Sequence, residues 1–154
     1  MIIQFIFLFI MNDFFFYWAH RLLHVPFFYK HIHKWHHEFS VTVAYSVIYA
    51  HPLEIIFGNQ LTFMIPAFAL GKKLHIVTYL CFFFYKVVNA HFAHSGFVLP
   101  INMGGYYPFQ AGPDYHDFHH LKNQGNYGGR IKLWDSIFGT NRYYYQLKNN
   151  KKNQ

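Results

Sequence analysis

The chain has 154 residues, of which 53% are hydrophobic, 23% aromatic and only 12% charged. This length gives one domain, and a soluble domain usually carries about 25% charged residues, so the composition argues against a protein surrounded by water. The formal net charge of +7 is compatible with nucleic acid or with anionic lipid headgroups as a neighbour, while the single cysteine excludes a disulfide framework and cysteine-rich zinc sites.

The first predicted element is a membrane helix over residues 1–19. These residues are apolar apart from Gln4, Asn12 and Asp13, and about 20 such residues cross a bilayer as a helix. A signal peptide is the competing interpretation, but no basic region precedes the run and no small-residue cleavage site follows it. The run continues directly into the motif HRLLH, so we predict a membrane helix whose end carries functional residues.

Two further apolar stretches, residues 53–70 and 74–90, predict a helical hairpin that dips into or crosses the membrane. They are joined by Gly71-Lys72-Lys73. If the hairpin crosses and returns, the segments that flank it lie on one face of the membrane. Most basic residues lie in those segments, so the positive-inside rule places that face in the cytosol.

Two polar, histidine-rich segments, residues 20–51 and 91–145, lie between and after the apolar stretches. The second contains glycine and proline breakers and is typical of loops around a short helix. The fold class that we predict is all-α, a membrane-embedded helical protein with a cytosolic, histidine-rich, metal-binding cap. Residues 1–145 form the predicted domain, and residues 146–154 a polar disordered tail.

Thirteen histidines are present, and three motifs contain eight of them. These are His20 and His24; His33, His36 and His37; and His116, His119 and His120. On a helix, residues at i, i+3 and i+4 share one side, so each HxxHH triplet is predicted to point its three imidazoles at one spot. Imidazoles brought together in a dry space without partners cost about 2–7 kcal/mol each, and protonation would crowd like charges. Metal ions remove both costs, and imidazole suits iron, zinc, copper and nickel.

Other residues are assigned around these clusters. His94 is predicted to join them, and His51 and His91 are further candidates, whereas His31 and His75 are interpreted as hydrogen-bonded core residues. Eight to ten histidines exceed what one ion can bind, so two metals are implied. Neither the Glu-x-x-His pairs of soluble di-iron bundles nor an HExxH zinc motif occurs in the sequence.

Two acidic residues are assigned supporting roles. Asp13 lies seven residues before His20 on the same helix face, and ionisable groups in membrane helices are functional candidates. We predict that Asp13 orients His20 by accepting its free ring N–H. Trp134 and Asp135 are predicted to stabilise the loop beneath the metals.

The order of these motifs carries a family resemblance. HRLLH, HKWHHE, AHPLE, HSG, HDFHH, GNYGG and LWDSIFGTN follow one another between residues 13 and 141. This series resembles the fatty acid hydroxylase/sterol desaturase superfamily, and AHPLE, HSG and WDxIFGT are most similar to its C-4 methylsterol oxidase branch. Members of the superfamily usually have additional membrane helices before this point, so the chain is interpreted as N-terminally short. The stretch around residues 89–91 also lacks an acidic residue expected in sterol oxidases.

The resemblance implies an oxygen-dependent oxidoreductase of the endoplasmic reticulum membrane that oxidises C–H bonds of a lipid, with sterol as the expected substrate. It also implies two iron ions, and electrons from NAD(P)H delivered by a b-type cytochrome and its reductase. The implied ligands are His20, His24, His33, His36, His37, His94, His116, His119 and His120.

Three alternatives stay open. Within the superfamily, the chain is also compatible with a sterol C-5 desaturase or with a hydroxylase of fatty acids or sphingolipids. From a different class, it is compatible with a truncated, non-catalytic protein that binds metal or lipid. A nucleic-acid-binding module has little support, because the positive charges flank membrane stretches rather than form a stripe, and no nucleic-acid partner is expected.

Overall fold

A computed structural model describes residues 1–97 and 109–152, and every regular element in these ranges is a helix. Three helical stretches are long and apolar enough to cross a membrane. The first is α1 (Ile2–Leu23). The second runs from Pro52 to Lys73 and comprises α3 (Pro52–Glu54), the π-helix η4 (Ile55–Gln60), α4 (Leu61–Leu70) and the 3-10 turn η5 (Gly71–Lys73). The third is α5 (Ile76–Ala93). The all-α prediction and the three membrane helices are confirmed.

The three long helices pack through a small aromatic core. Helix α1 contacts both α4 and α5, and Leu8, Phe63 and Phe82 are almost completely buried where the three meet. The rings of Phe63 and Phe82 stack with their centroids 5.9 Å apart, and Phe5 meets Phe82 edge-on at 5.3 Å. Aromatic pairs in such geometries stabilise beyond their buried area. Most other side chains of these helices are partly or fully exposed, as expected of surfaces that face lipid.

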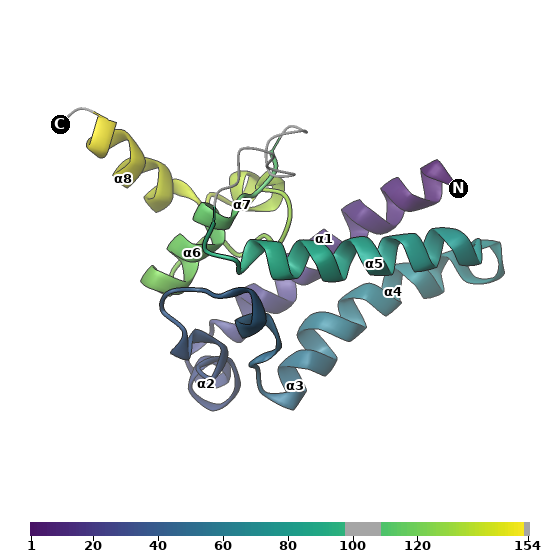
Figure 1. Cartoon of the computed structure of the whole chain (residues 1–154), viewed down its shortest axis with the longest axis horizontal. Coiled ribbons are helices and arrows are strands. Elements are labelled where there is room, and N and C mark those ends of the chain that lie inside the picture. Colours follow the sequence, from purple (N-terminus) through teal and green to yellow (C-terminus); the bar gives the residue numbers. More distant parts are fainter. Residues whose placement is uncertain (98–108, 153–154) are drawn as a thin grey trace.

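The hairpin turn lies at the same end of the molecule as the N-terminus (Figure 1). The side chain of Gln4 donates to the carbonyl oxygen of Lys73 at 2.6 Å and accepts from the backbone N–H of His75 at 3.2 Å. Helix α1 therefore leads away from this end, the second span returns to it, and α5 leads away again. The predicted hairpin is confirmed.

The cap lies at the other end of the helices, where the remaining elements gather (Figure 1). They are α2 (Pro26–Phe28), the π-helix η1 (Tyr29–His33), the 3-10 helices η2 (His36–Glu38) and η3 (Ala44–Ile48), α6 (Pro113–Lys122), α7 (Leu133–Phe138) and α8 (Arg142–Lys152). The second HxxHH motif lies on α6, as predicted. The first instead spans the end of η1 and the start of η2, so its backbone is not a regular α-helix.

The polar tail expected to be disordered from residue 146 is helical as far as Lys152. A contact with α6 explains why this segment is ordered. The hydroxyl of Tyr144 donates to Asp114 Oδ2 at 2.7 Å, and Lys148 Nζ lies 3.5 Å from the same oxygen. These contacts attach one face of α8 to the start of α6. The extent of the domain, residues 1–145, stays a prediction.

Candidate metal centre

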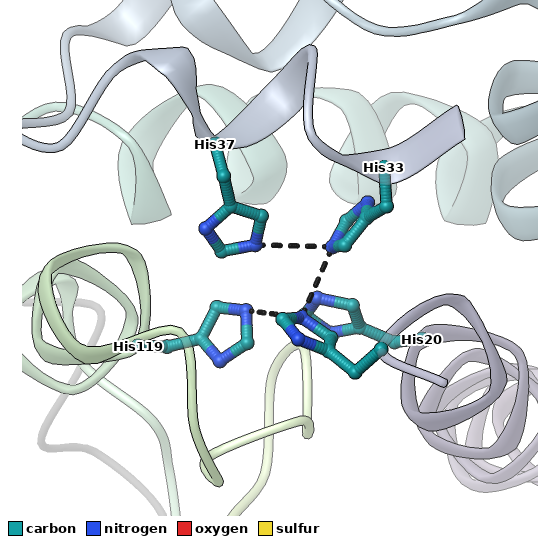
Figure 2. A group of neighbouring side chains, drawn as sticks. His20, His33, His37 and His119 are labelled. Atoms are coloured by element: carbon teal, nitrogen blue, oxygen red, sulfur yellow. Dashed lines mark hydrogen bonds between the residues drawn. The ribbon is translucent and has the colours of Figure 1, made fainter. Parts of the chain in front are cut away.

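Nine histidines converge in the cap and form two groups. Within each group, one ring nitrogen from every member lies within 4.8 Å of the others. We call the first group site A: His20, His24, His33, His37 and His119. We call the second group site B: His36, His94, His116 and His120. All nine predicted ligands are therefore brought together from α1, η1, η2, α5 and α6, and Figure 2 shows the labelled rings of site A facing one another.

The two sites share the HxxHH triplets, so the prediction that each triplet points at one spot is wrong. Site A takes His33 and His37 from the first triplet and His119 from the second, whereas site B takes the other members. Successive helical residues point about 100° apart, because a helix has 3.6 residues per turn. His119 and His120 on α6 therefore face different sites, while His116 and His120, at i and i+4, face the same one.

In site B, backbone carbonyls fix the orientation of three rings. The Nδ1 atoms of His36, His94 and His120 lie 3.3, 2.9 and 3.1 Å from the carbonyl oxygens of Tyr49, Ala90 and Phe39. A carbonyl oxygen only accepts hydrogen bonds, so each Nδ1 must carry the proton. The Nε2 atom of each neutral ring is then a bare lone pair that points into the site.

In site A, two rings are fixed by carbonyls and one by a carboxylate. The Nδ1 atoms of His20 and His119 lie 2.9 and 2.6 Å from the carbonyl oxygens of Tyr127 and Gly125. The Nδ1 atom of His33 lies 2.9 Å from Glu54 Oε2, with both side chains almost completely buried. In the described residues neither of these two atoms has another hydrogen-bond partner, so a proton must lie between them.

The Nε2 atoms come too close to one another for neutral rings alone. In site B, His36 and His94 have Nε2 atoms 3.1 Å apart, and His94 and His116 have theirs 3.0 Å apart. Because the Nδ1 atoms of His36 and His94 hold the protons, no proton remains to join their Nε2 atoms. Two lone pairs therefore face each other in a buried space, an arrangement that a bound cation makes favourable. The donor set fits a metal ion.

Burial opposes the alternative, which is to protonate the rings. Desolvation is the main cause, and repulsion from neighbouring imidazoles adds to it. Together they lower the pKa of His24 to about 2 and the pKa values of His36, His94 and His120 to about 3. The pKa values of His33, His116 and His119 are lowered well below the usual range for the same reasons. The rings are therefore neutral at physiological pH, as metal ligands must be.

The GNYGG segment supplies the carbonyls that orient site A, and Asp135 holds this segment. The two carboxylate oxygens of Asp135 accept from the backbone N–H groups of Tyr127 and Gly128 at 2.8 and 2.7 Å, and the hydroxyl of Thr140 donates to it at 2.6 Å. A Cβ at Gly128 would lie 2.5 Å from the carbonyl oxygen of Ile131, so only glycine fits there. The predicted role of Asp135 in stabilising this loop is confirmed.

The predicted partner of Asp13 is wrong. The free nitrogen of His20 faces the carbonyl of Tyr127, while Asp13 accepts from the backbone N–H of Arg130 at 2.8 Å. The guanidinium of Arg130 also donates to Asn12. Asp13 therefore attaches the loop after GNYGG to the middle of α1, and it supports site A only through that loop.

Sequence reasoning missed Glu54. Glu54 is a carboxylate within an apolar stretch of the sequence, three residues after the candidate ligand His51, and it is only 5% exposed. A charged group in a membrane helix is by itself a functional signal, and this one was available in the sequence.

Four histidines lie outside both sites. His51 and His75 accept from the N–H groups of Leu53 and Val77 and cap the starts of α3 and α5, and His91 contacts the carbonyl of Val87 on its own helix. His31 packs against Phe27. The interpretation of His31 and His75 as core residues is wrong, because both are exposed.

A cavity of about 70 Å³ adjoins both sites. Its walls include His20 and His33 from site A and His36, His94 and His116 from site B. The other walls come from the membrane helices α1, η4 and α5, from Val47 and Glu54, and from Gly129 and Arg130 of the cap. An all-helical membrane protein with two buried clusters of neutral imidazoles beside a cavity is the class that this fold and site define.

The fatty acid hydroxylase family model matches residues 5–140. The chain is 37% identical to methylsterol monooxygenase 2-2 of Arabidopsis thaliana, over 97% of this chain and 56% of that protein. It is 36% identical to the C-4 methylsterol oxidase erg25 of Schizosaccharomyces pombe, over 96% and 50%. It is also 36% identical to a very-long-chain aldehyde decarbonylase of Oryza sativa subsp. indica, over 94% and 54%.

The chain therefore belongs to the fatty acid hydroxylase family. It spans about half the length of the curated relatives that it matches. No solved structure matches the chain.

Proposed function

We propose that this chain carries the catalytic centre of an oxygen-dependent di-iron oxidoreductase of lipid metabolism, and that its reaction is the oxidation of a C-4 methyl group of a sterol. The observation that carries the proposal is the convergence of nine buried imidazoles in two groups, with facing Nε2 lone pairs. The names of two relatives, a methylsterol monooxygenase and a C-4 methylsterol oxidase, support the substrate.

Sites A and B would each hold one ion, with the nine histidines as ligands. Two iron ions supply the activation of dioxygen that an unactivated C–H bond requires and that no side chain can provide. The overall change is balanced as follows: R–CH3, O2, two electrons and two protons give R–CH2OH and water.

The chain's own residues have three tasks in this reaction. The carbonyls of Tyr127, Gly125, Tyr49, Ala90 and Phe39, together with Glu54, keep the ring nitrogens pointed inward. Such partners outside the ligand layer tune a metal site as well as orient it. The apolar residues of the cavity walls, Phe16 and Leu23 of α1 and Ala90 and Ala93 of α5, would help to keep water from the site and lie on the side from which a lipid would enter.

The partners and location follow from the family resemblance. We propose that electrons come from NAD(P)H through a b-type cytochrome and its reductase, and that the membrane is that of the endoplasmic reticulum. The excess of lysine and arginine in the segments of the cap supports a cytosolic position for both sites.

The metal content of purified protein tests the centre. Membranes expressing the chain should yield protein with about two iron ions per chain, and His119→Ala should reduce that number. His75→Ala is the matched control, because His75 is exposed and lies outside both sites. A metal content that is unchanged by His119→Ala, or equally changed by His75→Ala, would contradict the proposal.

Lipid analysis tests the reaction. When supplied with reduced b-type cytochrome, protein in membranes should consume oxygen and deplete added 4-methylsterol. Depletion of a fatty acid, a sphingolipid or a long-chain aldehyde instead would transfer the assignment to another member of the family. Two bound metal ions without oxygen consumption would identify a non-catalytic metal-binding protein.

A further inference from the structure

The cavity beside the two sites has a polar end that the metal centre does not use. Along α5, the residues that line the cavity are Lys86, Asn89, Ala90, Ala93 and His94. They form one stripe, because residues three and four apart share a helix face. The stripe runs from a cation through an amide and two small residues to a ligand of site B.

The side-chain amide of Asn89 is accessible from the cavity, because its atoms are not among the fully enclosed unpaired polar atoms of the described residues. Asn89 is only 7% exposed and lines the cavity, and within residues 1–97 and 109–152 its side-chain amide makes no hydrogen bond. Buried polar groups are almost always hydrogen-bonded, because an unpaired one is costly. An amide that opens into a cavity without a protein partner is therefore expected to meet a ligand there.

Lys86 is a cation within a membrane helix, and it is only partly satisfied. Its ammonium donates to the carbonyl oxygen of Asn59 at 2.7 Å and lies 5.3 Å from the ring centroid of Phe63. No carboxylate of the described residues forms an ion pair with it. An ammonium group has three N–H donors, so donors remain for a group in the cavity.

The other cation at the cavity, Arg130, is held by α1, although its Nε–H has no hydrogen-bond partner in the described residues. Its guanidinium donates to Asn12 and lies 3.7 Å from Asp13. Lys86, which only donates, and Asn89, which both donates and accepts, lie three residues apart on one face of α5 and both have hydrogen-bonding capacity left for a ligand. A hydroxyl matches this pair, since it accepts from the ammonium and donates to the amide oxygen.

We propose that Lys86 and Asn89 bind a hydroxyl group of the lipid substrate and thereby place a carbon close to that hydroxyl beside the metal sites. This inference rests on the proposed function for the identity of the reacting carbon. The eight steps along the chain from Lys86 to His94 span about 12 Å of helix at 1.5 Å per residue. The small residues Ala90 and Ala93 leave the cavity open over that distance.

The geometry selects a class of substrate. A hydroxyl held by Lys86 and Asn89 lies no more than about 12 Å along α5 from His94, so the carbon that is oxidised must lie within that distance of the hydroxyl. A sterol meets this requirement at C-4, which is bonded to the carbon that carries the 3-hydroxyl. A simple fatty acyl chain does not meet it when it is oxidised far from its carboxylate.

Binding to the intact chain in lipid nanodiscs tests this assignment. Two probes are compared: a 4,4-dimethylsterol, and the same sterol with hydrogen in place of the 3-hydroxyl. Both are measured by displacement of a radiolabelled sterol. The wild-type protein should prefer the hydroxysterol by about tenfold or more, the usual size of a buried hydrogen bond to a charged group.

Two variants remove the proposed contacts, and one serves as a control. Lys86→Met and Asn89→Leu should each remove most of the preference while the metal content stays unchanged. Lys72→Met changes an exposed lysine of the hairpin turn and should keep the preference. Equal binding of the two sterols to wild-type protein, or a preference that survives in both cavity variants, would overturn the proposal.

Two further arms separate this inference from the proposed function. A long-chain fatty acid is added as a competitor, and stronger displacement by the fatty acid than by the hydroxysterol would contradict a hydroxyl site. The metal content is measured on the same samples. A hydroxysterol preference in protein that binds no metal would refute the proposed function and leave the hydroxyl site standing. Two bound metal ions without the preference would refute the hydroxyl site and leave the proposed function standing.

Discussion

Sites A and B are built from the same two triplets, yet their surroundings differ. Site A has five imidazoles, and one of them contacts the carboxylate of Glu54. Site B has four imidazoles: the Nδ1 atoms of His36, His94 and His120 contact backbone carbonyls, and the Nδ1 atom of His116 has no hydrogen-bond partner in the described residues. The cavity is lined by three of the four rings of site B but by only two of the five rings of site A.

This difference predicts that the two sites have different roles, one in tight metal binding and the other in contact with the substrate. A site with five protein ligands and a carboxylate partner is close to saturated, which favours tight binding of its ion. A site with four ligands keeps positions open, and an open position beside a cavity is what catalytic metal sites require. We therefore expect site A to bind its ion more tightly and site B to face the substrate.

Removal of one ligand from each site tests the division with the largest expected effect. His94→Ala leaves three imidazoles at site B and should empty it, so that this variant holds about one metal ion in place of two. His37→Ala leaves four imidazoles at site A and should weaken metal binding there without abolishing it. Activity should fall by more than the 10–100-fold that loss of an outer partner costs. Metal analysis by mass spectrometry together with oxygen consumption checks this expectation, and loss of both ions from either variant would show that the sites are not separable.

Replacement of Glu54 tests whether the two sites are independent, because Glu54 contacts His33 of site A. Glu54→Ala should weaken metal binding at site A by about 10–100-fold and leave site B unchanged, since it removes the partner of His33 Nδ1. Glu54→Gln keeps an oxygen that accepts a hydrogen bond, so it should recover part of the affinity. A stepwise titration with a competing chelator resolves the two sites, and equal weakening of both would contradict the account.

Asp135→Asn tests the loop that orients site A. An asparagine can accept from one of the two N–H groups of Tyr127 and Gly128 but presents an amide to the other. One unsatisfied buried group costs about 1–3 kcal/mol of unfolding free energy. Thermal unfolding in detergent should show this loss, and the chelator titration should show weaker binding at site A than at site B. An unchanged unfolding temperature would show that the carboxylate does not hold the loop.

The smallest effect is expected from Lys148→Met, because Lys148 lies outside both sites. Lys148 and Asp114 are 50% and 44% exposed, and exposed ion pairs contribute about 0–1 kcal/mol. The same unfolding assay should detect a change within that range, and metal content should not change. A large loss of metal would mean that α8 supports α6 more strongly than its contacts indicate.

Several features of the fold and the site were predictable from the sequence, because they depend on local pattern. The long apolar runs indicated the membrane helices, and the turn Gly71-Lys72-Lys73 marked the hairpin. The density and spacing of histidines indicated the nine residues that the structure brings together. A stabilising role for Asp135 in the loop was also predicted, and its hydrogen bonds to Tyr127 and Gly128 agree with it.

The remaining features depend on contacts between distant segments. In both triplets the histidines at i and i+4 share a site and the histidine at i+3 belongs to the other site, and each site combines members of both triplets. The pairing of Asp13 with Arg130 joins residues 117 positions apart, and spacing along α1 contains no information about it. The order of α8 depends on Asp114 of α6, so the polar composition of the tail was misleading.

X-ray absorption at the iron edge, on protein purified with iron, tests the central claim most directly. The account predicts about two iron ions per chain and a first shell of nitrogen and oxygen, with the outer scattering that imidazole rings produce. His37→Ala and His94→Ala should each reduce both the iron content and the imidazole scattering. Iron without imidazole scattering, or protein that binds no metal while its histidines are intact, would contradict the account.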